Sequence, residues 1–253
     1  MKKYFKGFIL EFKKAKEYFL CFVSSLFYTP ISILIYYFLF KFIINGSTGF
    51  SMTLNEILIY YAVVLFIKST ITHSMAEVYY VFRDINDGDL DLWLTKPVYY
   101  PLVRYFRSLG SVAVTIPSGI LFLLIILIGK YSIINIGLFL ISVFLGFTLL
   151  FFVMFILGSL TFWLKNVLSL RDIFWCVLAF FSGEVIPLNL ISNEASFLLM
   201  NPLAGVYFLP TEVLKAQNPI YILAIQLMYV VFFMVISFLV FKLGIVKYES
   251  QGG

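Results

Sequence analysis

Four aspartates lie in one short segment, and there the residue types and spacing come closest to those of a metal site. They are Asp84, Asp87, Asp89 and Asp91. An EF-hand calcium loop requires the pattern D-x-[DN]-x-[DN]-G, and here Gly88 follows Asp84 one position too early. A two-metal phosphotransferase in the membrane requires acidic residues one helical turn apart on one face, whereas these alternate through a glycine turn. Neither metal chemistry fits the spacing.

Other groups that could carry catalysis are scarce. His73 is the single histidine, which excludes a multi-histidine metal site, and no G-x-x-x-x-G-K-[ST] motif for nucleotide phosphates occurs. Cys21 and Cys176 lie in apolar context, which favours buried apolar thiols over a disulfide or a thiolate metal site. The sequence therefore predicts a chain that is not itself an enzyme and binds neither a cofactor nor nucleic acid.

The aspartate segment instead predicts a short helix between two turns. Asp87-Gly88 is a turn signal, and Asp87 or Asp89 can cap the helix that follows. Lys96 would lie in the last turn, where a cation complements the helix dipole, and Pro97 ends the helix.

One face of this predicted helix has the composition of a protein interface. Leu90, Trp93 and Leu94 fall on one face at i, i+3 and i+4, with Asp91 in the first turn. An exposed aromatic and leucine pair with a charged rim is typical of binding surfaces. The alternative is an ordinary solvated loop.

The rest of the chain predicts an all-α membrane protein. Hydrophobic residues make up 62% and charged residues 12% of the chain, whereas soluble domains carry roughly a quarter charged residues. Apolar runs of about 20 residues recur, each long enough to cross a ~30 Å hydrocarbon core. We predict a single transmembrane domain over residues 1–253 with six spans, at residues 18–44, 54–82, 108–128, 133–164, 173–186 and 220–241.

Two further segments complete the predicted topology. Residues 1–17 place Phe and Ile at helical spacing with lysines largely elsewhere, which predicts a helix in the lipid interface; a disordered basic tail is the alternative. Residues 173–186 are too short to cross alone. Because Asn and Pro break the apolar stretch that follows, residues 173–218 predict a fifth span and an outer re-entrant or interfacial hairpin.

The distribution of Lys and Arg orients the predicted spans. Of the 18 such residues, 14 flank one side and three flank the other, while Lys68 lies inside the second span. Cytosolic loops carry the excess of positive charge. Both termini are therefore predicted to be cytosolic, together with the loops at 83–107 and 165–172.

Polar residues inside the predicted spans are candidates for a translocation path. Lys68, Thr72 and His73 lie in the inner half of the second span, and Glu184 is expected near the outer end of the path. The alternative is that Lys68 extends to the cytosolic headgroups and the hydroxyls bond back to their own helix. Glu184 is either a gate contact or a solvated charge of the hairpin.

The aspartate segment resembles that of the membrane subunits of type-2 ATP-binding-cassette exporters, in particular a bacterial six-span subfamily. That group has the form I-x-x-G-x-L-D-x-x-L-x-x-P-V after the second span, and residues 85–98 read I-N-D-G-D-L-D-L-W-L-T-K-P-V. A second matching region is S-G-E-V-I-P-L at 182–188, followed by breaks at 201–202 and 207–210. The resemblance covers nearly the whole chain, and the density of aspartates departs from it.

The resemblance implies a permease subunit of an exporter in the bacterial cell membrane. ATP would be bound and hydrolysed by separate ATPase subunits, and a second permease copy or a paralogous permease would complete the path. Residues 83–97 would be the main coupling helix, and residues 1–17 an elbow among the membrane lipids. A second ATPase contact would involve Lys165, Arg171 and Asp172. Drugs, antimicrobial peptides, lipids and glycans all fit as substrates.

Two other functions compete with this one. A secondary, ion-coupled transporter should show mid-span carboxylates and two related halves, and the sequence shows neither. A non-transporting membrane assembly subunit is also compatible with the sequence.

Overall fold

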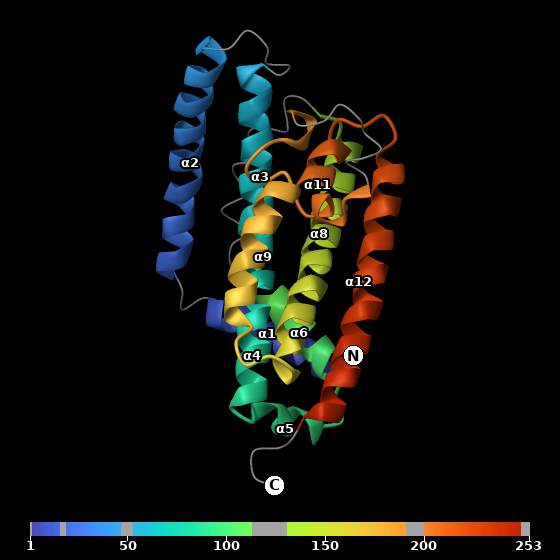
Figure 1. Ribbon diagram of the computed structural model, residues 1–253. Coiled ribbons are helices and arrows are strands. Elements are labelled where there is room, and N and C mark those ends of the chain that lie inside the picture. The colour runs from blue at the N-terminus through green and yellow to red at the C-terminus, as the bar shows by residue number, and fades with distance from the viewer. Residues whose placement is uncertain (1, 16–18, 47–52, 113–130, 191–199, 249–253) are drawn as a thin grey trace.

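The structure, a computed structural model, describes residues 2–15, 19–46, 53–112, 131–190 and 200–248. Every regular element in these ranges is a helix. Figure 1 shows the long helices side by side, with a short helix, α5 (Asp89–Leu94), across one end. Most of the third predicted span, 108–128, lies outside the described residues.

Three helical segments among the described residues are long and apolar enough to cross a bilayer. They are Leu54–Asn86, Ile133–Phe162 and Pro219–Lys247. The first combines α3 (Leu54–Met75) with α4 (Glu77–Asn86), the second is α8 (Ile133–Ser159) with the 3₁₀ turn η1 (Leu160–Phe162), and the third is α12. A further helix, α2 (Phe19–Gly46), runs beside α3. These elements confirm the predicted all-α membrane class.

Residues next to each start determine where the three spans begin. Thr53 and Glu56 form a capping box at α3, in which the Thr53 amide donates to the Glu56 carboxylate at 2.9 Å. Ser132 accepts from the Asn135 amide at 3.2 Å at the start of α8. Pro219 occupies the first position of α12, where a missing N–H costs nothing. The observed starts lie within one residue of the predicted ones.

The core is built around α8. In its most apolar stretch 67% of α8 is buried, against 17% for α12, so α8 is central and α12 faces mainly outward. The Ser142 hydroxyl donates to the Gln226 side chain at 2.7 Å, and the Gln226 amide donates to the carbonyls of Ser142 and Gly205. These bonds tie α8 and α12 to η3 (Pro202–Gly205).

The chain after α9 (Leu168–Phe181) turns back into the bundle. Gly183 has a φ of 88°, a conformation that favours glycine. The hydroxyls of Tyr60 and Tyr61, both on α3, donate to the carbonyls of Gly183 and Val185 at 2.6 Å each. The short elements η2 (Leu188–Leu190) and α11 (Phe208–Val213) follow in this region.

One prediction about α9 is wrong. Cys176 is exposed rather than buried, because α9 directs Leu178 and Ala179 inward and its other face outward. In a membrane-spanning protein the outward face is apolar as well, so an apolar sequence context does not separate the two environments. The side chain of Cys21 lies outside the described residues.

At the other end, α1 (Lys2–Ala15) packs against α6 (Tyr100–Val112) with its backbone close to a glycine. A Cβ added at Gly110 would lie 2.6 Å from the carbonyl oxygen of Phe8. Figure 1 shows α1 lying across the long helices near the end that carries α5.

The contact between α4 and α8 can be tested through two glycines of α8. A Cβ at Gly158 would lie 2.8 Å from the Cβ of Val81, so Gly158→Ala is expected to destabilise the protein by about 1–3 kcal/mol. A Cβ at Gly137 meets nothing within 4 Å, and Gly137→Ala should be neutral or stabilise by up to ~1 kcal/mol. Thermal unfolding in detergent measures both, and equal melting temperatures would contradict the close contact.

Candidate functional site

The predicted turn before α5 is confirmed, and the predicted aspartate cap is wrong. Gly88 has a φ of 78° and is itself the residue that precedes the helix, with no side-chain cap. The left-handed conformation is what glycine provides, and glycine has no side chain with which to cap. Asp89 and Asp91 lie in the first turn instead, where their charge complements the helix dipole.

The exposed face of α5 also differs from the predicted one. Leu90 is 0% exposed, whereas Leu92 and Leu94 are 59% and 42% exposed. Trp93 is half-buried, with the Lys96 ammonium 4.5 Å and the Arg107 guanidinium 5.4 Å from its ring centroid. The apolar surface that α5 presents is therefore formed by Leu92 and Leu94.

Other exposed side chains lie near α5 in the sequence or follow η1. Asp87, Asp89, Lys96 and Pro97 are exposed. Trp163 and Leu164, which follow η1, are exposed as well. This end of the bundle thus combines exposed leucine and tryptophan with charges of both signs, the composition that protein interfaces use.

The second predicted contact region lies at the start of α9. Lys165 is exposed. Arg171 donates from Nε and Nη2 to the Asp172 carboxylate at 2.9 and 2.7 Å, so these two predicted contact residues bind each other. Both line a small cavity with Met75 and Trp175, beside the junction of α3 and α4.

A buried polar network, which the sequence analysis missed, joins α4 to α6. Arg104 donates from Nε and Nη2 to the Glu77 carboxylate at 3.0 and 3.3 Å, and the Tyr100 hydroxyl donates to Asp84 at 2.8 Å. Arg104 Nη1 lies 3.9 Å from the same Asp84 oxygen. All four side chains are buried. Asp84 therefore lies in the interior, unlike the exposed Asp87 and Asp89 of the same segment.

Helical spacing was the signal that could have revealed this network. Glu77 and Asp84 are seven residues apart, and Tyr100 and Arg104 four apart, so each pair shares one face of its helix. Burial alone would lower the pKa of the Arg104 guanidinium, but the carboxylates of Glu77 and Asp84 outweigh burial and raise that pKa. The cation is permanent, so it ties α4 and α6 together on either side of α5.

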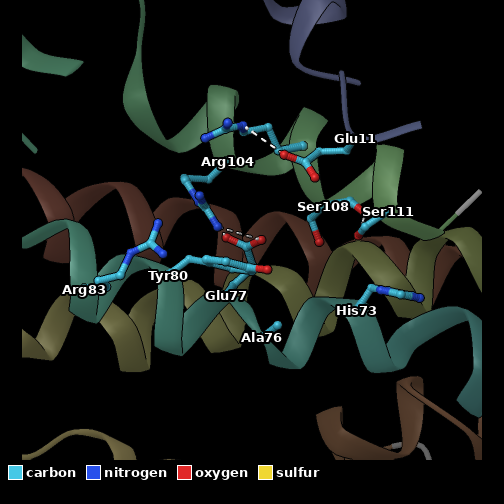
Figure 2. Close-up of a pocket in the computed structure, with 10 residues that line it drawn as sticks. Glu11, His73, Ala76, Glu77, Tyr80, Arg83, Arg104, Ser108 and Ser111 are labelled. Carbon is cyan, nitrogen blue, oxygen red and sulfur yellow. Dashed lines mark hydrogen bonds and ion pairs between the residues drawn. The ribbon is translucent and has the colours of Figure 1, made fainter. Parts of the chain in front are cut away.

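The four candidates for a translocation path separate into two places. Lys68 Nζ lies 2.7 Å from Oε1 of Glu184, which is buried. Thr72 is exposed and donates to the Lys68 carbonyl at 2.5 Å, in agreement with the alternative that hydroxyls bond back to their own helix. His73 instead lines a cavity with Glu77, as Figure 2 shows.

This arrangement corrects two sequence-based expectations. Lys68 does not extend to the headgroups, because Glu184 binds it inside the bundle. The expectation that Lys68 lies in the inner half of its span while Glu184 lies near the outer end of the path is wrong, since the two side chains are 2.7 Å apart. Among the residues that the structure describes, no group of three His, Cys, Asp or Glu side chains could hold a metal ion.

The described chain thus combines apolar helices long enough to span a membrane with a short helix, α5, across one end. The family model described as ABC-2 family transporter protein matches residues 23–252, and the chain belongs to this family. No curated protein and no solved structure matches the chain. Membership confirms the predicted resemblance to type-2 permeases. The chain is a membrane-embedded permease component of ABC-type transport, which is not itself catalytic.

The buried network yields a stability prediction. Glu77→Gln would leave the Arg104 guanidinium buried without its carboxylate, and should destabilise the protein by about 3–5 kcal/mol. The double variant Glu77→Gln with Arg104→Met removes both charges and should recover most of that loss. Thermal unfolding in detergent measures the effect.

A matched control for this prediction is Glu11→Gln. Glu11 pairs with Arg107 at 3.5 Å, and both side chains are partly exposed, so the change should cost about 1 kcal/mol or less. If Glu77→Gln and Glu11→Gln lowered the melting temperature equally, the buried network would contribute no more to stability than the partly exposed Glu11–Arg107 pair.

Proposed function

We propose that the chain is the permease subunit of an ATP-driven exporter, coupled through residues 83–97 to separate ATPase subunits that bind the ATP. The observation that carries the proposal is the exposure of Leu92 and Leu94 on α5, at the end of the bundle. Exposed leucines with charged neighbours have the composition that protein interfaces use. Membership of the ABC-2 family supplies the kind of partner, an ATP-binding subunit.

The connections of α5 support a role as a lever. Its buried side, Leu90, packs into the hydrophobic core, and the flanking helices α4 and α6 are joined by Glu77 and Arg104. Helices α3 and α4 together make 33 residues, about 50 Å of helix at 1.5 Å per residue. Closure of an ATPase dimer against α5 would therefore move a long helix that carries Lys68 in its middle.

The remaining features of the exporter are part of the same proposal. We assign six spans, with α1 as an elbow in the lipid interface and the segment after α9 as an outer re-entrant hairpin. Both termini would be cytosolic in a bacterial cell membrane, as the distribution of Lys and Arg indicates. The substrate path would lie between this chain and a second permease, identical or paralogous, with Lys165, Arg171 and Asp172 as a second ATPase contact.

The Lys68–Glu184 pair is the candidate contact along the path. It lies between α3 and the turn after α9, and the Lys68 side chain retains 29% exposure. An ion pair that is accessible from one side can exchange its partner for a polar group of a substrate. Thr72 and His73 remain candidates for the path only because they lie on α3 with Lys68.

Docking of the ATPase can be tested with three leucines of one helix. Leu92→Ala with Leu94→Ala should weaken ATPase binding about tenfold or more, because these side chains form the exposed apolar surface. The measurement is the amount of ATPase that co-purifies in mild detergent when the chain is co-expressed with its neighbouring genes. Leu90→Ala is the matched control: it should lower the melting temperature by creating a cavity and leave docking by the folded fraction intact.

Either of two results would overturn the coupling assignment. If the double variant retained as much ATPase as the wild type, α5 would not be the docking surface. If no ATPase co-purified with the wild type, the partnership itself would fail.

A second experiment separates transport from packing at Lys68. Lys68→Leu leaves Glu184 buried without its partner, so stability and transport should both fall. Lys68→Leu with Glu184→Leu removes both charges and should restore the melting temperature, but not ATPase stimulation by a panel of drugs, peptides, lipids and glycans. Full recovery of stimulation in the double variant would remove the pair from the path.

A further inference from the structure

A cavity of about 200 Å³ lies between α1, the junction of α3 and α4, and α6. Its wall includes three arginines, namely Arg83, Arg104 and Arg107. Figure 2 shows Glu77 and His73 on one side of it and Ser108 on the other. Of these side chains, Arg83 belongs to the proposed coupling segment 83–97 and His73 to the candidates for the path, whereas Arg104, Arg107 and Ser108 line the cavity only.

Hydrogen-bond donors exceed acceptors in this cavity. Each guanidinium offers five N–H donors. In the described part of the chain, the hydrogen bonds of the three arginines are the two from Arg104 to Glu77, at 3.0 and 3.3 Å. Arg107 Nε lies 3.5 Å from Glu11, and Arg83 Nη2 lies 3.7 Å from Asp84, both longer than a charge-assisted bond of about 2.7–2.9 Å.

One buried hydroxyl of the wall has no hydrogen-bond partner among the described residues. Ser108 is 3% exposed, and its Oγ makes no hydrogen bond within the described structure, whereas the Ser111 hydroxyl donates to the Ser108 carbonyl at 2.7 Å. Figure 2 shows the Ser108 hydroxyl turned toward the side that carries Glu77 and His73. A buried polar atom without a partner costs about 1–3 kcal/mol, so an acceptor in the cavity would satisfy it.

From this geometry we propose that the cavity binds a phosphate oxyanion, held by Arg107 and Arg83 and by the Ser108 hydroxyl. The oxyanion supplies only acceptors, and guanidinium groups match its geometry with paired N–H donors. The cavity is smaller than the roughly 300–1,000 Å³ of sites for drug-sized ligands, so it fits one ionic group. Arg104 stays bound to Glu77 and forms the floor of the site.

Two sources can supply this group, a phospholipid headgroup and free phosphate. The position of the cavity beneath α1 favours the headgroup, because α1 exposes Phe5, Leu10 and Phe12 on the same element that contributes Glu11 to the wall. Such a helix lies among lipid headgroups. The carboxylates of Glu11 and Glu77 and the imidazole of His73 also face the cavity, so a ligand must reach the arginines without close approach to Glu11.

The test uses the full-length permease alone in detergent, so it is independent of any ATPase. Calorimetry measures binding of short-chain phosphatidylglycerol and, separately, of inorganic phosphate at constant ionic strength. Arg107→Gln should raise the dissociation constant about tenfold, and Ser108→Ala about threefold to tenfold. Lys215→Gln, which removes an exposed cation away from the cavity, is the matched control and should bind like the wild type.

The outcomes either identify the source of the phosphate group or overturn the proposal. Binding of phosphatidylglycerol alone assigns the site to a lipid headgroup, and binding of inorganic phosphate assigns it to the free ion; each requires loss in both variants. Ser108→Ala keeps the test decisive if Arg107→Gln loosens α1, because it removes one oxygen and leaves every ion pair in place. The proposal is overturned if neither probe binds the wild type, or if both variants bind like the wild type.

Discussion

The bidentate ion pair between Glu77 and Arg104 is the constraint on which the α5 end of the bundle depends. Both charges are buried, and a buried charge is stable only while its partner stays in place. The pair therefore fixes how α4 and α6 face each other, and the Tyr100–Asp84 bond adds a second point of attachment. An apolar pair of similar volume would often stabilise as well or better, so the contribution of this pair is a defined geometry. Helix α5 takes its orientation from that geometry.

Much of this architecture follows from local sequence, because helix starts and spans depend on neighbouring residues. The capping box at Thr53, the cap at Ser132 and the proline at position 219 each set a boundary without distant contacts. The face of α5 was not predictable in the same way. Leu90 and Leu92 lie on opposite sides of α5, and which of them is buried depends on a core formed by other helices. Likewise, Arg104 was interpreted only as one of the positive charges that orient the spans, because Glu77, the carboxylate that it binds, lies 27 residues away in the sequence.

Hydropathy also could not separate the core from the periphery. Helices α8 and α12 have similar mean hydropathies, 2.8 and 2.5. Yet 67% of the most apolar stretch of α8 is buried, against 17% of that of α12. Lipid tails are as apolar as leucine, so a helix gains nothing in hydropathy from facing protein rather than lipid. The inward side of α12 is marked by a polar residue, Gln226, whose three hydrogen bonds need buried partners. In this protein, isolated polar residues within apolar helices are better guides to the interior than the apolar residues themselves.

The Lys68–Glu184 bond has a consequence for the order in which the protein is made. The two residues are 184 − 68 = 116 positions apart, so at about 5–20 residues per second Lys68 is synthesised roughly 6–23 s before Glu184. During that interval the amine has no counterion from the turn after α9. A lysine in the middle of a span costs about 2.5–3.5 kcal/mol on insertion, and only the apolar residues of its own helix can offset that. The first 22 residues of this span therefore have to enter the bilayer on their own hydropathy, and the salt bridge closes on a helix that is already there.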